Sequence, residues 1–473
     1  AFKPAALTRF IERLAFQVEF IKNNYWSDSN HRISQAQAVT LAGLLFPEMK
    51  QASEWVTNGS TILNEEIVKQ YFADGWLKDN DLHYHIGSIE SFRSAMVVAE
   101  ANGQTDRFPA DYIAAMRKMV EVEKYLIYPN YAVYNKGSIT DADYSTPNFG
   151  DTRPSSWTRN ILLRHMRNYR DLFPDDQEFK WLASQGAEGK VPPTGIKYFE
   201  DGGHYTIRNG WTKDATMMVL VNAAQTPKEA WHRQWDNNNF ELYINGRQFF
   251  PDSGVFSYGG TSVTERNKYA RTDYHSTMTL GNANVTSCRG VCRLAEERGD
   301  YDLLVPENPS YTGLTHRRSV WFVDHKFFVI LDEGYGTAEG TVNLNFHLLP
   351  GRTLSEVVVD AAENGAHTAF ADGNNLLVRT FANKSVTTTA RTGYVSLVLD
   401  EATERPSYQV DLAKTAGEKA ARFITVLYPA SDASAATVSA SFVDEEFSET
   451  AARISVTAGG QTYRLSYTLE PKN

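Results

Sequence analysis

The sequence predicts an α+β protein of several domains, a helical N-terminal domain followed by a large antiparallel β domain. Its 473 residues are too many for one ordinary core. The first third shows apolar residues at helical spacing, whereas the rest consists of short segments rich in β-branched and aromatic residues. We place the boundary near residue 190, so the predicted domains are 1–190 and 191–473.

Helical periodicity begins with residues 7–21, where Arg9, Glu12 and Arg13 occupy the face opposite the apolar residues. The same spacing predicts further helices over residues 34–45, 53–72, 89–101, 110–128 and 156–169. Residues 185–195 are rich in glycine and proline, which ends the helices and marks a linker.

Strands are predicted after the linker, over residues 217–221, 240–244, 320–323 and 327–331. Asn245 and Gly246 directly follow the alternating run 240–244, and this dipeptide is a strong signal for a tight hairpin. Because a tight hairpin joins antiparallel neighbours, the predicted sheet is antiparallel.

The composition limits the functional classes. The formal net charge is -10, which argues against a nucleic-acid partner because such proteins need an excess of Lys and Arg. The sequence has no run of about 18 apolar residues, so no membrane span is predicted. Aromatic residues make up 12% of the chain, as expected either for rings that line a sugar-binding cleft or for a large β domain.

Two polar residues of the helical region are candidates for chemistry. Asn30 stands at a loop-to-helix junction, where its side chain can point into a cleft or, as is common for asparagine, cap the helix. Tyr84 lies between two histidines in a segment predicted to be a loop, residues 79–85, and can be catalytic or structural.

A polar run in the β region, His232 to Asp236, is a second candidate. On a strand, His232, Gln234 and Asp236 would share one face. Asp252 and His275 each stand at the end of a predicted strand. Together with Gln234 they could form an oxygen and nitrogen site suited to Zn²⁺ or Ca²⁺.

From Tyr25 to about Tyr428 the chain resembles the heparinase II/III group of polysaccharide lyases, most closely the heparinase III (heparan sulfate lyase) branch. The residues that carry the resemblance form ordered blocks along the chain: Asn30 to Glu48, Asp74 to His85, Phe149 to Asp151, His232 to Tyr243, Pro251 to Phe256, Tyr274 to Thr277, Asn308 to Tyr311, His316 to Val320 and Asp372 to Leu376.

This resemblance implies an α/α toroid followed by a large antiparallel β-sandwich domain. Toroids of this family contain more helices before the asparagine than the single one predicted here, so we expect an incomplete toroid. The implied activity is β-elimination on a heparan sulfate-type glycosaminoglycan, which leaves a C4–C5 double bond in the uronate product. The implied partner is therefore an acidic polysaccharide, and the implied location is the bacterial periplasm or the exterior of the cell.

The resemblance also implies roles for the first candidates. Matched position by position, Asn30 would bind the uronate carboxylate. Tyr84 would act as general acid and as general base, and His232 would be its partner acid or base.

The remaining predicted site residues hold a metal or contact substrate. By the same matching, Gln234, Asp252 and His275 would be ligands of a structural metal. Many relatives have histidine where Gln234 stands, which leaves calcium open beside zinc, and no organic cofactor is implied. Guanidinium groups suit sulfate and carboxylate, and we expect substrate contacts from residues in or beside the blocks, namely His31, His85, Asp151, Arg153, Arg233, Asn238 and Arg271.

Two other functions stay open. The pairs Asn30-His31 and Tyr274-His275 also occur in alginate lyases, so an alginate or other polyuronate lyase of related fold is an alternative. A non-catalytic glycan-binding protein is another. The sequence makes no prediction of endo or exo cleavage, sulfation preference or oligomeric state.

Overall fold

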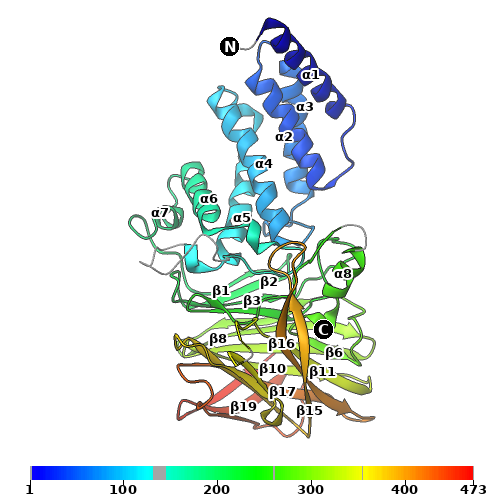
Figure 1. The fold of residues 1–473 in the computed structure, drawn as a ribbon, viewed down its shortest axis with the longest axis vertical. Helices are drawn as coiled ribbons and strands as arrows, with labels where there is room; N and C mark the ends of the chain where they lie inside the picture. The colour runs from blue at the N-terminus through cyan, green and yellow to red at the C-terminus, as the bar shows by residue number, and fades with distance from the viewer. Residues whose placement is uncertain (1–2, 132–144, 259–261, 354, 472–473) are drawn as a thin grey trace. The chain divides into compact units, whose positions relative to one another are not determined.

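The computed structural model describes residues 3–131, 145–258, 262–353 and 355–471, which Figure 1 traces. Contacts within the chain divide it into two compact units, Ala1–Lys124 and Tyr125–Asn473. We refer to them as the helical unit and the β unit. Among the described residues, no helix combines the length and the apolar character needed to cross a membrane.

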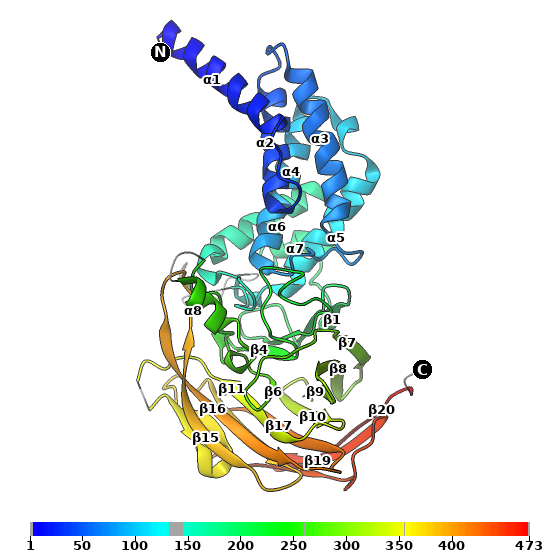
Figure 2. The same ribbon diagram turned by 90° about the vertical axis from the view of Figure 1, so that its right-hand side faces the viewer.

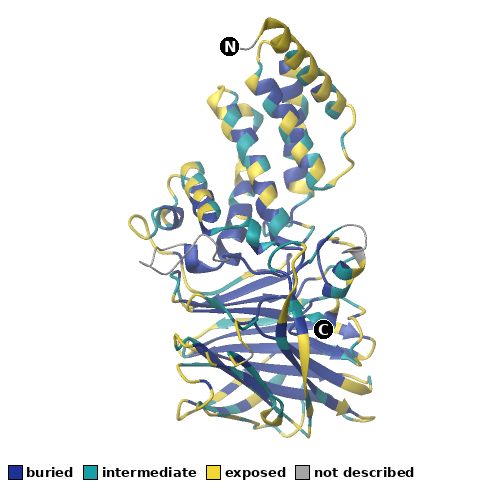
Figure 3. Ribbon diagram, in the orientation of Figure 1, coloured by how far each residue is buried: buried dark blue, intermediate teal, exposed yellow. Residues whose placement is uncertain are grey.

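The helical unit contains α1 to α5, and their positions confirm the first five predicted helices. Their bounds are α1 Pro4–Lys22, α2 Ser29–Leu45, α3 Ala52–Lys69, α4 Leu82–Ala101 and α5 Ala110–Leu126. A core of Val18, Val39, Ala42 and Trp55 joins α1, α2 and α3. Within this unit α1 is mostly exposed, whereas one face of α2, α3 and α4 is buried (Figure 3).

Close approach of α2 and α3 depends on glycine. A Cβ atom added at Gly59 of α3 would lie 2.6 Å from the Ala36 carbonyl oxygen of α2, and one added at Gly43 of α2 would lie 2.4 Å from the Ala52 oxygen. Any side chain at either position would push the two helices apart, so glycine sets their separation.

The β unit begins with helices. The predicted helix over residues 156–169 is α6, Arg159–Leu172, and it is followed by α7, Gln177–Ala183, which the sequence did not predict. α7 has only seven residues, and the Asp176 carboxylate starts it by accepting hydrogen bonds from the Glu178 and Phe179 amides at 2.7 and 3.0 Å. The change from helix to strand falls within the predicted linker.

A five-stranded antiparallel meander comes next, in the order of the chain. Its strands are β1 Gly195–Phe199, β2 His204–Arg208, β3 Thr216–Val221, β4 Asn239–Ile244 and β5 Arg247–Gln248. Ile244 pairs with Arg247, so Asn245 and Gly246 alone form the turn, with φ of 46° and 82°. Positive φ at both positions is typical of a type I′ turn, which confirms the predicted hairpin.

Three further antiparallel sheets complete the unit. The largest has the order β12-β13-β14-β17-β10-β9-β8-β7, the second β15-β16-β11-β6 and the third β18-β19-β20. The strands of the largest are β7 Val291–Glu297, β8 Tyr301–Tyr311, β9 Leu314–Val323, β10 Phe327–Tyr335, β12 Val357–Asp360, β13 Gly365–Thr368, β14 Asn375–Ala382 and β17 Ala420–Ala430. The others are β6 Met278–Leu280, β11 Gly340–His347, β15 Thr387–Val395, β16 Thr403–Lys414, β18 Val438–Phe442, β19 Ala451–Ala458 and β20 Gln461–Thr468.

In the middle of the eight-stranded sheet, β10 is buried on both faces. On β10, Phe328 and Ile330 belong to the core shared with β2–β4, β11 and β16, whereas Val329 and Leu331 belong to the core shared with β19 and β20. Figure 2 shows β19 and β20 on the outer side of β10 and β17. This double burial explains why residues 327–331 are continuously apolar, with no polar alternation.

We predict that Gly246→Ala lowers the free energy of unfolding by about 1–2 kcal/mol, because its φ of 82° is unfavourable for a residue with a Cβ atom. The added Cβ would also lie 2.3 Å from Lys213 Cε. Denaturation by urea measures the change. The matched control is Gly299→Ala, where a Cβ meets nothing within 4 Å; equal stability of the two variants would contradict the turn assignment.

Candidate active site

Asn30 lies in the first turn of α2 and is half-buried. The N-cap residue is Asp28, so the alternative in which Asn30 caps the helix is wrong. The turn is fixed to α3, because Gln70 Nε2 donates to the Ser29 carbonyl oxygen at 3.0 Å and Arg32 Nε donates to Glu66 Oε1 at 2.8 Å. The backbone that carries Asn30 is therefore held in place by its neighbouring helix.

His31 follows Asn30 and is exposed. Its ring packs against Trp26, with 4.7 Å between the ring centroids. The structure leaves this imidazole at the surface of the helical unit, where the predicted contact with substrate is sterically open.

Tyr84 is half-buried in the first turn of α4, and the predicted loop over residues 79–85 is partly wrong. Asp81 caps this helix, and its Oδ1 accepts a hydrogen bond from the Tyr84 amide at 3.0 Å. The apolar period used for the prediction starts only at residue 89, so it missed a polar first turn that the cap stabilises. The phenol is thus carried by a helix terminus, which is more rigid than a loop.

His85 is fully buried behind Tyr84. Its Nδ1 accepts from the Leu77 amide at 3.3 Å, its Nε2 donates to the Met119 oxygen at 2.9 Å, and Trp76 stacks on the ring. Burial lowers the pKa of His85 to about 4. The structure therefore gives His85 a packing role that anchors α4, in place of the substrate contact expected from the sequence.

His232 lies in the β unit, in a turn that precedes β4, so His232, Gln234 and Asp236 do not lie on a strand and the shared strand face considered for them does not form. The Asp151 amide donates to the His232 carbonyl oxygen at 3.0 Å, and Asp151 Oδ2 lies 3.0 Å from His232 Nδ1. A carboxylate at this distance favours the tautomer with the proton on Nδ1, in which Nε2 is the basic ring nitrogen.

Asp151 is fully buried, so its predicted contact with substrate is replaced by a positioning role for His232. Arg266 of α8, Ser262–Tyr269, balances its charge: Nη2 and Nε donate to Asp151 Oδ2 at 2.6 and 3.2 Å. The sequence gives no signal for this pairing, because Asp151 and Arg266 are 115 positions apart.

Two more predicted substrate contacts are buried. Arg233 donates through Nη2 to Asp236 Oδ1 at 3.2 Å and also bonds to Gln225 and Asn237. Asn238 adopts a φ of 60° in the turn before β4, and its Nδ2 donates to the His316 oxygen at 3.0 Å. Both side chains stabilise the loop that carries His232, so neither presents its side chain to a ligand.

The two other arginines predicted to contact substrate, Arg271 and Arg153, are less buried than Arg233. Arg271 is exposed and forms an ion pair with Asp273 at 2.8 Å, and Arg153 is half-buried with its guanidinium 5.3 Å from the centre of the Tyr258 ring. Both lie at the surface of the β unit, where a guanidinium can meet an anionic group.

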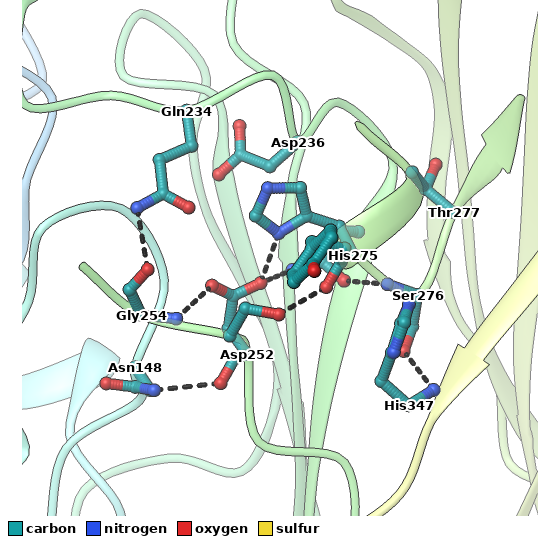
Figure 4. Close-up of polar contacts among 12 residues, drawn as sticks. Asn148, Gln234, Asp236, Asp252, Gly254, His275, Ser276, Thr277 and His347 are labelled. Carbon is teal, nitrogen blue, oxygen red and sulfur yellow. Dashed lines mark hydrogen bonds and ion pairs between the residues drawn. The ribbon is translucent and has the colours of Figure 1, made fainter. Parts of the chain in front are cut away.

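The three predicted metal ligands come together in the β unit. His275 Nδ1 lies 2.6 Å from Asp252 Oδ2, and Gln234 Nε2 donates to the oxygens of Gly150 and Gly254 at 2.7 and 3.0 Å. Figure 4 shows Gln234, His275 and Asp252 turned toward one another, with Asp236 beside them. Residues more than forty positions apart in the sequence thus share one buried site.

The atoms left over in this site fit a cation. Within the described part of the chain, Gln234 Oε1 and His275 Nε2 are buried without a hydrogen-bond partner, which is costly unless another group binds them. The described residues contain no group of three or more His, Cys, Asp or Glu side chains placed to hold a metal, so a site here requires the Gln234 amide. Asp252 orients His275 from the other ring nitrogen, as carboxylates do for metal-bound histidines.

The site is also surrounded by buried acidic groups. Burial raises the pKa of Asp236, and burial together with the nearby Asp252 raises the pKa of Glu241. Burial opposes protonation of His275, but the Asp252 contact raises its pKa overall. The sequence missed Asp236 as a member of this cluster, although its spacing from Gln234 was noted.

Comparison with known proteins gives matches along the whole chain. A family model described as Heparinase II/III N-terminus matches residues 1–181, and one described as Heparinase II/III-like, C-terminal matches residues 191–440. A heparin-sulfate lyase of Bacteroides thetaiotaomicron is 43% identical over 485 residues, covering 99% of this chain and 67% of the relative. A heparin-sulfate lyase of Bacteroides stercoris is 34% identical, with the same two coverages.

Solved structures agree with these matches. A crystal structure of heparinase III superposes with a TM-score of 0.91 and 41% identity, covering 99% of this chain and 72% of the other. A crystal structure of heparan sulfate lyase from Pedobacter heparinus gives a TM-score of 0.84 and 31% identity, covering 100% and 71%. These similarities confirm the predicted fold class, an α/α toroid followed by a large antiparallel β-sandwich domain.

The buried imidazole of His85 predicts a dependence of stability on pH. The folded protein holds its pKa near 4, whereas a histidine in an unfolded chain titrates near 6.5. Between these values the unfolded chain binds a proton that the folded protein does not, so stability falls as the pH decreases from 6.5 toward 4. In urea denaturation, the difference in unfolding free energy between the parent and His85→Gln should narrow by about 2 kcal/mol from pH 7 to pH 4.5; parallel pH profiles would contradict this.

Proposed function

The chain belongs to the heparinase II/III family of polysaccharide lyases, and we propose that it cleaves a heparan sulfate-type glycosaminoglycan by β-elimination. The observation that carries this function is the 43% identity, across 99% of the chain, to a protein named heparin-sulfate lyase. The individual roles below rest on the matched motif positions and on the local geometry of each residue.

β-Elimination consists of three chemical events. A base removes the proton from C5 of the uronate, the C4–O bond breaks, and an acid protonates the departing oxygen. The C5 proton is only weakly acidic until the neighbouring carboxylate is neutralised, so a hydrogen-bond donor to that carboxylate stabilises the charge that develops. We assign this donor to Asn30, whose amide adds no titrating group.

Tyr84 is assigned as acid and base. When the uronate is glucuronate, the C5 proton and the leaving oxygen are on the same face of the ring, and one phenol can serve both steps in turn. A tyrosine in a model peptide has a pKa of about 10, so a phenol acts as a base only where nearby donors stabilise the phenolate. The Asp81 cap fixes the backbone that carries this phenol.

His232 is assigned as the base for iduronate, in which the C5 proton is on the opposite face. The Asp151 carboxylate holds the imidazole by Nδ1 at 3.0 Å, so Nε2 is the nitrogen that takes the proton. The two epimers of the uronate therefore require different residues as the base.

We predict that Tyr84→Phe lowers turnover at least about 1000-fold while binding of heparan sulfate is retained, because the ring remains and only the proton-transferring hydroxyl is lost. The absorbance of the unsaturated product measures turnover, and calorimetry measures binding. Tyr25→Phe is the matched control: it removes a phenol that donates to Asn58 Oδ1 in the same unit and should leave turnover within about twofold.

A panel of polyuronates in the same assay separates this function from its alternatives. Cleavage of heparan sulfate in preference to alginate agrees with the proposal, and preferential cleavage of alginate would replace it with the polyuronate-lyase alternative. Binding without an absorbing product from any polymer would identify a glycan-binding protein.

We also propose one structural divalent ion, held by Gln234 Oε1 and His275 Nε2 with the Asp252 carboxylate beside them. A bound cation would neutralise a buried acidic site and fix the loops on either side of β4. The oxygen and nitrogen donors suit Ca²⁺ or Zn²⁺. Because heparan sulfate is an extracellular polymer, we further propose that the protein acts in the periplasm or outside the cell.

Elemental analysis of the purified protein should find about one Ca or Zn per chain, and chelation should lower the thermal midpoint by about 5 °C or more. Asp252→Asn should lose the ion. Asp171→Asn, which changes an exposed carboxylate paired with Arg170, is the control and should retain it. The metal assignment fails if the protein contains no stoichiometric ion and chelation leaves the midpoint unchanged.

A further inference from the structure

Trp231 is an exposed aromatic residue directly beside His232. Its relative exposure is 54%, although large aromatic side chains are normally buried. The indole and imidazole rings have centroids 4.8 Å apart at an angle of 81°. An apolar ring thus lies at the surface next to the proposed proton-transferring group.

The indole is held in a fixed position by its neighbours. Arg266 Nη2 donates to the Trp231 carbonyl oxygen at 2.7 Å, and the guanidinium carbon lies 4.2 Å from the centre of the indole ring. Tyr258 stacks on the same residue with 6.0 Å between centroids. Tyr258 is itself fixed, because its hydroxyl donates to the backbone carbonyl oxygen of Asp151 at 3.2 Å.

These contacts connect Trp231 to the residues that position His232. Arg266 bonds at the same time to Trp231 and to the Asp151 carboxylate that holds the imidazole. The distance and orientation between indole and imidazole are therefore set by one shared group. A cation–π contact at an exposed site contributes modestly to stability, and the same contacts preorganise the indole as a binding surface.

The chemistry around the indole matches an anionic sugar. A flat, partly exposed indole offers an apolar face to the C–H groups of a pyranose ring. The Arg153 guanidinium lies 5.3 Å from the centre of the Tyr258 ring, which is itself stacked on Trp231. A guanidinium at that position suits a sulfate or carboxylate group of the polysaccharide whose sugar ring stacks on the indole.

We propose that Trp231 is a substrate-binding platform, on which a sugar ring next to the cleaved uronate stacks, and that Arg153 binds a sulfate or carboxylate group of the bound chain. This inference rests on the proposed function and extends it by naming a subsite. The platform contributes to binding and not to proton transfer.

The test uses Trp231→Ala and Trp231→Phe in the full chain with a size-defined heparan sulfate oligosaccharide. Removal of the ring should raise KM roughly tenfold and leave kcat within about twofold, because the stacking contact is lost and the proton-transferring groups remain. Trp231→Phe keeps a ring and should restore most of the affinity. Tyr198→Ala, which removes an exposed ring on β1 that stacks on Tyr205, should change neither constant.

Binding is measured separately in the Tyr84→Phe background, in which the oligosaccharide should bind without being cleaved. There Trp231→Ala should raise Kd roughly tenfold, and the change in tryptophan fluorescence on binding should disappear in Trp231→Phe. If the parent forms no unsaturated product but this Kd shift is found, the lyase proposal fails and the platform stands. An unchanged Kd and KM in Trp231→Ala, or an equal loss of kcat in both Trp231 variants, would overturn the platform.

Discussion

A buried carboxylate must find hydrogen-bond donors within the protein, and the side chain of Asp151 does so with three different groups. Its Oδ2 accepts hydrogen bonds from His232 Nδ1 and Arg266 Nη2, and its Oδ1 lies 3.4 Å from Gln234 Nε2. One carboxylate thereby fixes the proposed base, the guanidinium beneath Trp231 and a proposed metal ligand. The positions of His232, Arg266 and Gln234 in the β unit are thus linked through one shared carboxylate.

The segments that carry the site residues of the β unit are irregular and buried, so their backbone groups lack the partners that a sheet provides. Arginines from the strands supply them. Arg318 of β9 donates to the oxygens of Asn238 and Ser276, and Arg405 of β16 donates to the Pro251 oxygen. The double-sided core that buries β9 and β10 therefore does more than stabilise the fold, because it holds the anchors of the functional loops at fixed positions.

The fold was predictable from local patterns, whereas much of the site was not. Helical spacing located five helices of the helical unit, and Asn245-Gly246 located a hairpin, since both signals depend on neighbours in sequence. The roles of Asp151 and His85 were missed because burial and pairing depend on residues far away in the chain. The polar alternation from His232 to Asp236 is compatible with a strand, but it is equally compatible with the irregular turn that the structure shows. The motif positions still identified Gln234 and His275 as neighbours, which spacing alone cannot do.

In the proposed reaction the C4–O bond of the uronate breaks by elimination and not by addition of water. Cleavage of a size-defined heparan sulfate oligosaccharide in water enriched in ¹⁸O, followed by mass spectrometry, tests this most directly. Elimination predicts that the masses of the two products sum to the mass of the substrate and that neither product contains ¹⁸O. Incorporation of one ¹⁸O atom per cleavage, with no unsaturated product, would show hydrolysis and contradict the claim.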